Sequence, residues 1–162
     1  MIKPASLRAA LVAALPIYAV NPDKLVLYID KGRLVSRLTA GLDYEWRYTV
    51  RVEFHDCTAE PDAIAIPLLL WLREHQPERL LEFEREDSAL GFAADIIDGS
   101  TWDLAWAFEL SEPVALQPKD RGGWDVTHLR EPTLADDAWL TGAAPATLVG
   151  EIWLGDRLIV TR

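Results

Sequence analysis

Two stretches of the chain alternate between large apolar residues and polar or small ones, and the alternation is strict in residues 45–55. In residues 45–55 the apolar positions are Trp46, Tyr48, Val50, Val52 and Phe54. In residues 101–110 they are Trp102, Leu104, Trp106, Phe108 and Leu110. Successive side chains of a β-strand point to opposite faces, so both stretches are predicted to be half-buried strands.

A helical spacing appears near the N-terminus. Leu7, Leu11 and Leu15 recur at intervals of four residues, which predicts a short amphipathic helix over residues 6–15. Pro16 cannot continue a helix and is expected to end it. The narrow apolar stripe favours packing against a core over binding a separate partner.

A second helix is predicted over residues 62–76. Its centre is the apolar run 68–72, and a polar last turn precedes Pro77. Pro67 is expected near the first turn, because a proline in the helix interior removes a backbone hydrogen bond. This helix is expected to lie across the sheet.

Short segments with turn signals fill much of the remainder. Residues 30–32, Asp-Lys-Gly, predict a hairpin turn between strands 24–30 and 33–38, and Asp98-Gly99 predicts another between residues 90–97 and 101–110. Residues 78–88 are expected to form a loop that holds a short edge strand at 80–84. A further strand is predicted at 124–129, followed by loop composition over 131–147. Residues 151–161 predict a closing hairpin that turns at Gly155-Asp156.

These elements together predict one α+β domain over residues 1–162. Its sheet is expected to be mixed but mostly antiparallel, covered on one face by the two main helices and followed by a terminal β-hairpin. The other apolar faces are available for burial between subunits. The sequence shows neither an internal repeat nor a domain linker.

Composition excludes several classes of protein. The 162 residues carry a formal charge of −10, whereas a DNA-binding domain needs clustered Lys and Arg. A single cysteine, Cys57, cannot form an internal disulfide. The N-terminal residues lack a signal-peptide pattern, and the longest apolar run, 66–72, is too short to span a bilayer. We therefore expect synthesis in the cytoplasm and no contact with membranes.

The sequence gives no sign of catalytic chemistry. His55 and Cys57 can share one face of a strand, but a zinc site needs three or four ligands. No nucleophile elbow, phosphate-binding loop or dinucleotide fingerprint is present. We expect neither cofactor nor metal nor enzymatic activity. The alternative from another class is a small hydrolase with an unrecognised site using His55, His75 or His128.

Two tryptophans lie outside the predicted core strands. Trp139 belongs to the Pro- and Gly-rich stretch and Trp153 to the closing hairpin. Tryptophan is enriched in interface hot spots, and a hairpin has free edges that can extend another subunit's sheet. We predict a subunit interface that includes Trp139, Trp153 and Leu154.

Several segments resemble the R-type tail completion proteins of contractile-tailed temperate phages. The resemblance begins at residues 3–8 and continues through Asn21-Pro22-Asp23 and residues 30–32. It is strongest over Arg47-Tyr48-Thr49-Val50 and over residues 67–77, which read PLLLWLREHQP, and weaker through residues 94–96. The closing segment 151–156 is also similar, whereas 117–145 and the acidic residues 82–87 contribute little.

The resemblance implies a structural protein at the head-proximal end of a tail. It implies a ring, hexameric in related tail terminators, that stops tube growth and prepares head joining. Partners would be other copies of the chain, the tail tube and sheath proteins and the head–tail connector. Assembly would occur in the host cytoplasm, and the product would be a phage tail or a tail-like bacteriocin. The alternative within assembly is a connector or assembly factor without terminator activity.

The resemblance also suggests a use for the acidic charge. DNA would pass through the lumen of such a ring without specific binding. If acidic residues line that lumen, they repel the DNA and do not retain it. The competing interpretation is that these acids are solvated surface.

Overall fold

The computed structural model describes residues 1–36, 42–81, 90–130, 151–154 and 157–161. The chain divides into two compact units, Met1–Glu131 and Pro132–Arg162, which are described in turn. The expectation of one domain over residues 1–162 stays a prediction. None of the described helices is long and apolar enough to cross a membrane.

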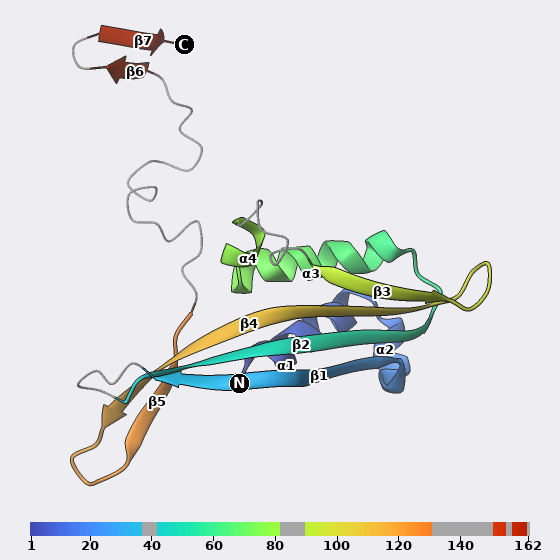
Figure 1. Ribbon diagram of the computed structural model, residues 1–162, viewed down its shortest axis with the longest axis horizontal. Coiled ribbons are helices and arrows are strands. Elements are labelled where there is room, and N and C mark those ends of the chain that lie inside the picture. Colours follow the sequence, from blue (N-terminus) through green and yellow to red (C-terminus); the bar gives the residue numbers. More distant parts are fainter. Residues whose placement is uncertain (37–41, 82–89, 131–150, 155–156, 162) are drawn as a thin grey trace. The chain divides into compact units, whose positions relative to one another are not determined.

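The first unit is built on a five-stranded sheet. Its strand order is β1-β2-β4-β3, and β5 pairs with β4 off this path (Figure 1). All pairings described in this sheet are antiparallel. The strands are β1 (Leu25–Ser36), β2 (Tyr44–Cys57), β3 (Gly91–Ile96), β4 (Trp102–Pro118) and β5 (Trp124–His128).

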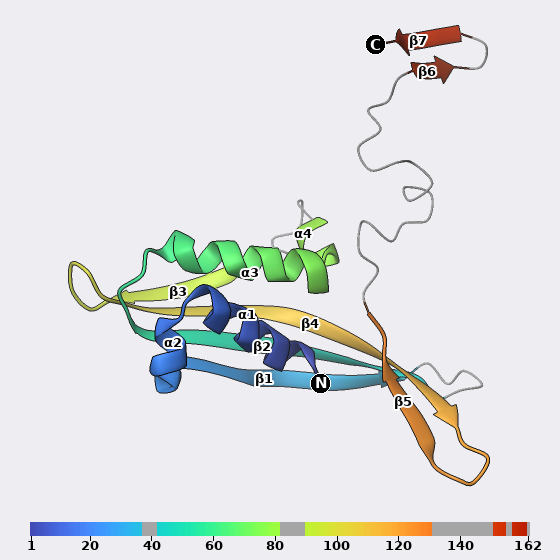
Figure 2. The same cartoon turned by 180° about the vertical axis from the view of Figure 1, so that it is seen from behind.

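Helices cover one face of this sheet. They are α1 (Lys3–Ala14), α2 (Ile17–Val20), the 3-10 turn η1 (Pro22–Lys24), α3 (Pro61–His75) and α4 (Glu78–Leu81). Figure 2 shows α1, α2 and α3 on the same side of the sheet, and Figure 1 shows the opposite side bare of helices. The predicted α+β class, with two main helices over a mostly antiparallel sheet, is confirmed.

The hydrophobic core lies between the sheet and these helices. The alternating positions of β2 and β4 that were predicted to face inward are buried from Tyr48 to Phe54 and from Leu104 to Leu110. Phe54 is fully enclosed, with the rings of Tyr18 and Trp106 edge-on at centroid distances of 5.3 Å and 5.7 Å. Leu7 and Leu11 of α1 and Ile64, Leu68, Trp71 and Leu72 of α3 complete the core.

The predicted hairpin at residues 30–32 is wrong. β1 runs without interruption from Leu25 to Ser36 and carries a bulge at Asp30, which is skipped in the pairing with β2. Gly32 pairs with Tyr48 inside the strand and not in a turn, and a Cβ there would lie 3.4 Å from the Cβ of Tyr48, an ordinary van der Waals contact. A bulge inserts one residue and keeps the strand running in the same direction, so the Asp-Lys-Gly signal did not distinguish it from a turn.

Both helix boundaries shifted slightly, and one expectation about α3 was wrong. α1 begins three residues before the predicted start, so that Pro4 falls in the first turn where its missing N–H is tolerated. Pro67 lies in the interior of α3 and not near its first turn. The carbonyl of Ala63 therefore lacks its helical hydrogen bond, which is tolerable because Ala63 is exposed to water.

The segment after α3 was also predicted incorrectly. Residues 78–81 form the helical turn α4, so the expected edge strand does not begin at Leu80. The remainder of that prediction, residues 82–84, lies outside the described residues. The Asp98-Gly99 turn is confirmed: Asp98 accepts hydrogen bonds from the N–H (2.7 Å) and hydroxyl (3.0 Å) of Ser100, and these bonds lower the pKa of Asp98.

β4 extends eight residues beyond the predicted Leu110. Pro113 had weakened the strand signal, because proline cannot donate to a sheet. β3 pairs with β4 only up to Ala107 and β5 only from Val114, so β4 has no strand partner on that edge between them. The N–H of Ser111 points into this gap, and Pro113, two residues on, points the same way. The Pro113 carbonyl oxygen accepts a hydrogen bond from the Leu129 N–H at 2.9 Å, so the β5 side of β4 is bonded at Pro113 through this acceptor although the proline has no N–H to donate.

The second unit contains the predicted closing hairpin. β6 (Glu151–Leu154) and β7 (Arg157–Thr161) pair antiparallel and form a two-stranded sheet of their own. The predicted turn residues Gly155 and Asp156 lie outside the described residues.

Candidate functional site

A buried carboxylate joins the N-terminus of α1 to the sheet. Glu112 of β4 is 2% exposed and accepts hydrogen bonds from the backbone N–H groups of Ile2 (2.7 Å) and Lys3 (3.2 Å) and from the Tyr48 hydroxyl. α1 has no side-chain cap and no acidic residue of its own in its first turn. Glu112 therefore supplies, from a distant strand, the cap and the negative charge that a helix N-terminus favours.

The ionisation of this cluster follows from its contacts. Burial raises the pKa of Glu112, but the hydrogen bonds from Tyr48, Ile2 and Lys3 outweigh burial and hold the pKa below its ordinary value. Burial and the same hydrogen bond raise the pKa of Tyr48. His128 of β5 places Nδ1 3.2 Å from Glu112 Oε2, close enough for an ion pair when the imidazole is protonated, although the angle is not that of a hydrogen bond.

A second buried contact ties α3 to the same place. Gln76, the C-terminal cap residue of α3, accepts hydrogen bonds from Lys3 Nζ at 2.7 Å and from the Ser111 N–H at 3.1 Å. Its amide nitrogen donates to the Ser111 hydroxyl at 3.1 Å. Gln76 thereby occupies the gap between β3 and β5 on the edge of β4.

Contacts between the two helices continue this network. Trp71 Nε1 of α3 donates to the Ser6 hydroxyl of α1 at 3.1 Å. The His75 ring stacks on Trp71 with a centroid distance of 4.5 Å, and its Nδ1 lies 3.0 Å from the Trp71 carbonyl oxygen. The strongest resemblance segments, 47–50 and 67–77, meet the N-terminal segment 3–8 here, because each contributes to the same buried polar cluster.

The three histidines lie on different elements. His55 is on β2, with Nε2 3.8 Å from Glu53 and Nδ1 3.7 Å from Asp103, whereas His75 closes α3 and His128 ends β5. Within the described ranges, no group of His, Cys, Asp and Glu could hold a metal ion. Cys57 is buried, with its sulfur 3.7 Å from the carbonyl oxygen of Ala59.

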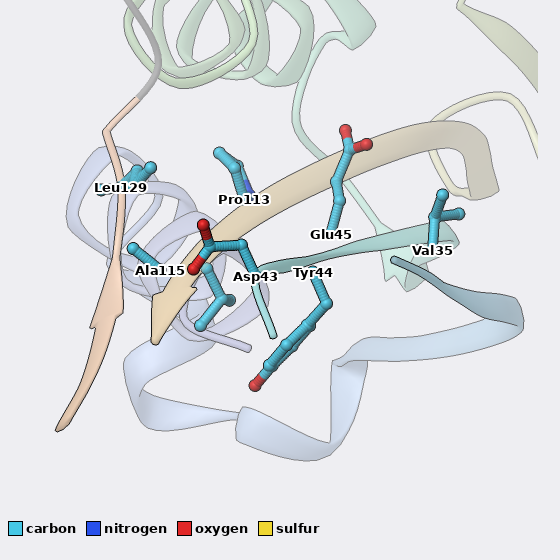
Figure 3. Close-up of a pocket in the computed structure, with 8 residues that line it drawn as sticks. Val35, Asp43, Tyr44, Glu45, Pro113, Ala115 and Leu129 are labelled. Atoms are coloured by element: carbon cyan, nitrogen blue, oxygen red, sulfur yellow. The ribbon is translucent and has the colours of Figure 1, made fainter. Parts of the chain in front are cut away.

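A pocket of about 210 Å³ lies where the ends of β1, β2 and β4 approach β5 (Figure 3). Its carboxylates are engaged in structural contacts: Asp43 accepts a hydrogen bond from the Leu116 N–H at 2.7 Å, and Glu45 pairs with Arg47 at 2.7 Å. The other lining residues are Val35, Tyr44, Pro113, Val114, Ala115 and Leu129. The pocket is therefore a mostly apolar recess whose two acids already have partners.

The face of the sheet opposite the helices is polar. Arg51 pairs with Asp30 at 3.2 Å, and the Tyr28 hydroxyl donates to Glu53 at 2.7 Å. Further along β1 and β2, a second recess is lined by Lys31, Gly32, Arg33, Arg47, Tyr48, Thr49 and Glu109. Partly exposed ion pairs contribute little to stability. The fold therefore does not depend on these charged side chains, and they are available for contact with other molecules.

Large apolar side chains are exposed on several elements. On β3, Phe92 and Ile96 are 69% and 68% exposed, although they lie opposite Trp106 and Trp102 on the face that the helices cover elsewhere. Further ones include Ile66, Leu69 and Leu70 on α3, Trp124 and Val126 on β5, Ile17 and Val20 on α2, and Tyr28 and Leu34 on β1. Where such side chains lie together, they are typical of sites of protein–protein contact.

The predicted interface of Trp139, Trp153 and Leu154 stays a prediction. Trp139 lies outside the described residues, and Trp153 and Leu154 lie on β6. The Glu112 cluster was missed by sequence reasoning, although a signal was present. Glu112 continues the inward-facing series of alternate residues on β4, and a charged residue at such a position marks a buried polar contact.

Comparisons with known proteins identify the family to which this chain is similar. The family model described as P2 phage tail completion protein R (GpR) matches residues 1–132. The curated "Tail completion protein R" of Escherichia phage P2 is 37% identical over 159 residues, which covers 98% of this chain and 97% of that protein. No solved structure matches.

Proposed function

Because the chain belongs to the P2 phage tail completion protein R family, we propose that it completes a contractile tail as a ring-forming cap at the head-proximal end. The single observation that carries this proposal is the 37% identity to tail completion protein R over nearly the whole of both chains. A tail completion protein acts by binding tail components, and its final location is the tail of the particle.

The proposed mechanism is geometric. One face of a ring of copies would bind the last ring of the tail tube. The opposite face would offer no binding surface to a further tube subunit. Exposed apolar residues on α3, β3 and β5 supply surface for the contacts that such a ring needs. The sheath and the head–tail connector would be further partners of the same ring.

The formal charge of −10 per copy fits a lumen through which DNA passes. Acidic residues along that lumen would repel phosphate, and the repulsion would favour release over retention. No specific contact with DNA bases is part of this proposal.

Tail length tests the proposed function. Particles produced with and without this gene are compared by electron microscopy. Overlong tails of variable length in its absence are the expected result, because nothing would then stop the tube from growing.

Two other results would change the conclusion. Tails of normal length that fail to join heads would favour the alternative, a connector or assembly factor without terminator activity. Complete particles with normal tails would contradict both forms of the proposal.

A further inference from the structure

We propose that the C-terminal hairpin β6–β7 of one copy adds to the free edge of β3 in the next copy. This inference rests on the proposed ring and names the contact that builds it. Two features of the chain support it: the two-stranded hairpin β6–β7 and the edge strand β3.

The first feature is the closing hairpin. Among the strands that the structure describes, β6 and β7 pair with each other as a two-stranded sheet. Its nine described residues include six apolar ones: Ile152, Trp153, Leu154, Leu158, Ile159 and Val160. An isolated two-stranded hairpin is marginally stable in water, and a third strand or a packing surface is needed to hold it.

The second feature is the edge strand β3, which within the described residues pairs on one side only. β3 ends the strand path β1-β2-β4-β3, and all six of its residues are exposed. Just after β3, the N–H of Ile97 donates to the carbonyl oxygen of Thr101, which directly precedes β4. The backbone N–H of Ile97 therefore points toward β4. Alternate residues of an antiparallel strand turn their backbone groups the other way. Phe92, Ala94 and Ile96 therefore present theirs to the free edge.

The opposite edge of the sheet is less suitable. β1 is continuous but carries a bulge at Asp30, with Lys31 and Arg33 close beside it. Bulges and charges of this kind protect an edge against pairing with another chain. β3 has no bulge and carries one charged residue, Asp95, and two of its side chains, Phe92 and Ile96, offer apolar contact beside the free backbone groups.

Symmetry favours a second copy as the source of the hairpin. The hairpin and the β3 edge are different surfaces of the same chain, so a contact between two copies through them is heterologous, and heterologous contacts form rings when the rotation between copies closes. Residues 129–150 separate β5 from β6. A segment of about 22 residues can extend over roughly 70 Å, enough to reach a neighbouring molecule.

Hydrogen exchange of the full-length protein tests the contact directly. In the isolated chain the amides of Phe92, Ala94 and Ile96 should exchange rapidly, because they point away from β4. We expect them to become protected only at concentrations where sedimentation shows that copies associate. Protection in the dilute monomer would mean that the hairpin binds its own β3, and absence of protection in the assembled protein would place it elsewhere. Either result overturns the proposal.

A matched set of variants supplies the second test. Ala94→Pro removes an outward-facing N–H without removing a bond to β4 and is expected to weaken association at least about tenfold. A chain ending after Gly150 should show the same loss, and the two changes combined should add nothing further, because both remove one contact. Independent, additive losses would contradict the inference.

Tail length then separates failure of this inference from failure of the proposed function. Overlong tails with Ala94→Pro support the inference. Tails of normal length with Ala94→Pro, in a phage whose gene deletion gives overlong tails, would overturn only the hairpin contact. Normal tails after deletion of the gene would overturn the proposed function and the inference together.

Discussion

Phe54→Ala is expected to lower the free energy of unfolding by about 3–5 kcal/mol, the range for removing a large aromatic side chain from a core. Phe54 is 1% exposed, and its ring contacts those of Tyr18 and Trp106 edge-on. Truncation would leave a cavity between the sheet and the helices at the centre of the molecule. Urea denaturation followed by tryptophan fluorescence measures the change.

Phe92→Ala is the matched control. It makes the same chemical change on the same sheet, but Phe92 is 69% exposed and its ring only approaches Trp106, with a centroid distance of 6.4 Å. The expected loss of stability is at most about 1 kcal/mol. Because Phe92 lies on the edge proposed to receive the hairpin, this variant should weaken self-association while the monomer stays folded. Equal losses of stability at the two positions would contradict the described core.

Glu112→Gln is expected to be the second most disruptive of these changes, with a loss of about 2–4 kcal/mol. Glutamine has nearly the same volume, but it carries no charge and replaces one acceptor oxygen with a donor. At least one of the N–H groups of Ile2 and Lys3 or the Tyr48 hydroxyl would then lose its acceptor. Glu109→Gln is the control on the same strand, where the side chain is 62% exposed, and it should change stability by no more than about 0.5 kcal/mol.

The contribution of Glu112 to the free energy of unfolding should decrease as the pH falls into the acidic range. Its pKa in the folded protein lies below the ordinary value of 4.5, so ionised Glu112 stabilises the fold above about that pH. As the pH falls through the folded pKa, the contribution is lost. The stability difference between the wild-type protein and Glu112→Gln should therefore be constant near neutrality and narrow below about pH 4.5. A difference that widens on acidification would be evidence against the assigned ionisation.

The buried cluster and the proposed interface have separate roles in this molecule. Glu112 and Gln76 hold the ends of α1 and α3 against β4. The exposed edge of β3 and the hairpin are left for contacts outside the chain. Changes in the cluster should therefore act on folding, and changes at the edge on assembly.

The sequence by itself determined the elements whose periodicity is local. The alternation in β2 and β4 and the four-residue spacing in α1 predicted their type and their inward faces, because those patterns repeat within a single element. The resemblance to the tail completion family could also be recognised from the sequence, because it depends on the order of residues in short segments. The Asp98-Gly99 turn was predicted for the same reason: its bonds to Ser100 are local.

Only the tertiary structure decided which segments that are distant in the sequence contact one another. Asp30-Lys31-Gly32 has the composition of a turn, but pairing along the whole of β2 makes it a bulge. Pro113 weakens the strand pattern in the sequence, but pairing with β2 and the hydrogen bond from the Leu129 N–H to its carbonyl oxygen continue β4 through it. The role of Glu112 depends on a helix terminus 109 residues away in the chain. A capping contact between such remote residues leaves no periodic pattern, because the attraction between carboxylate and N–H depends on their distance in space and not on their separation in sequence.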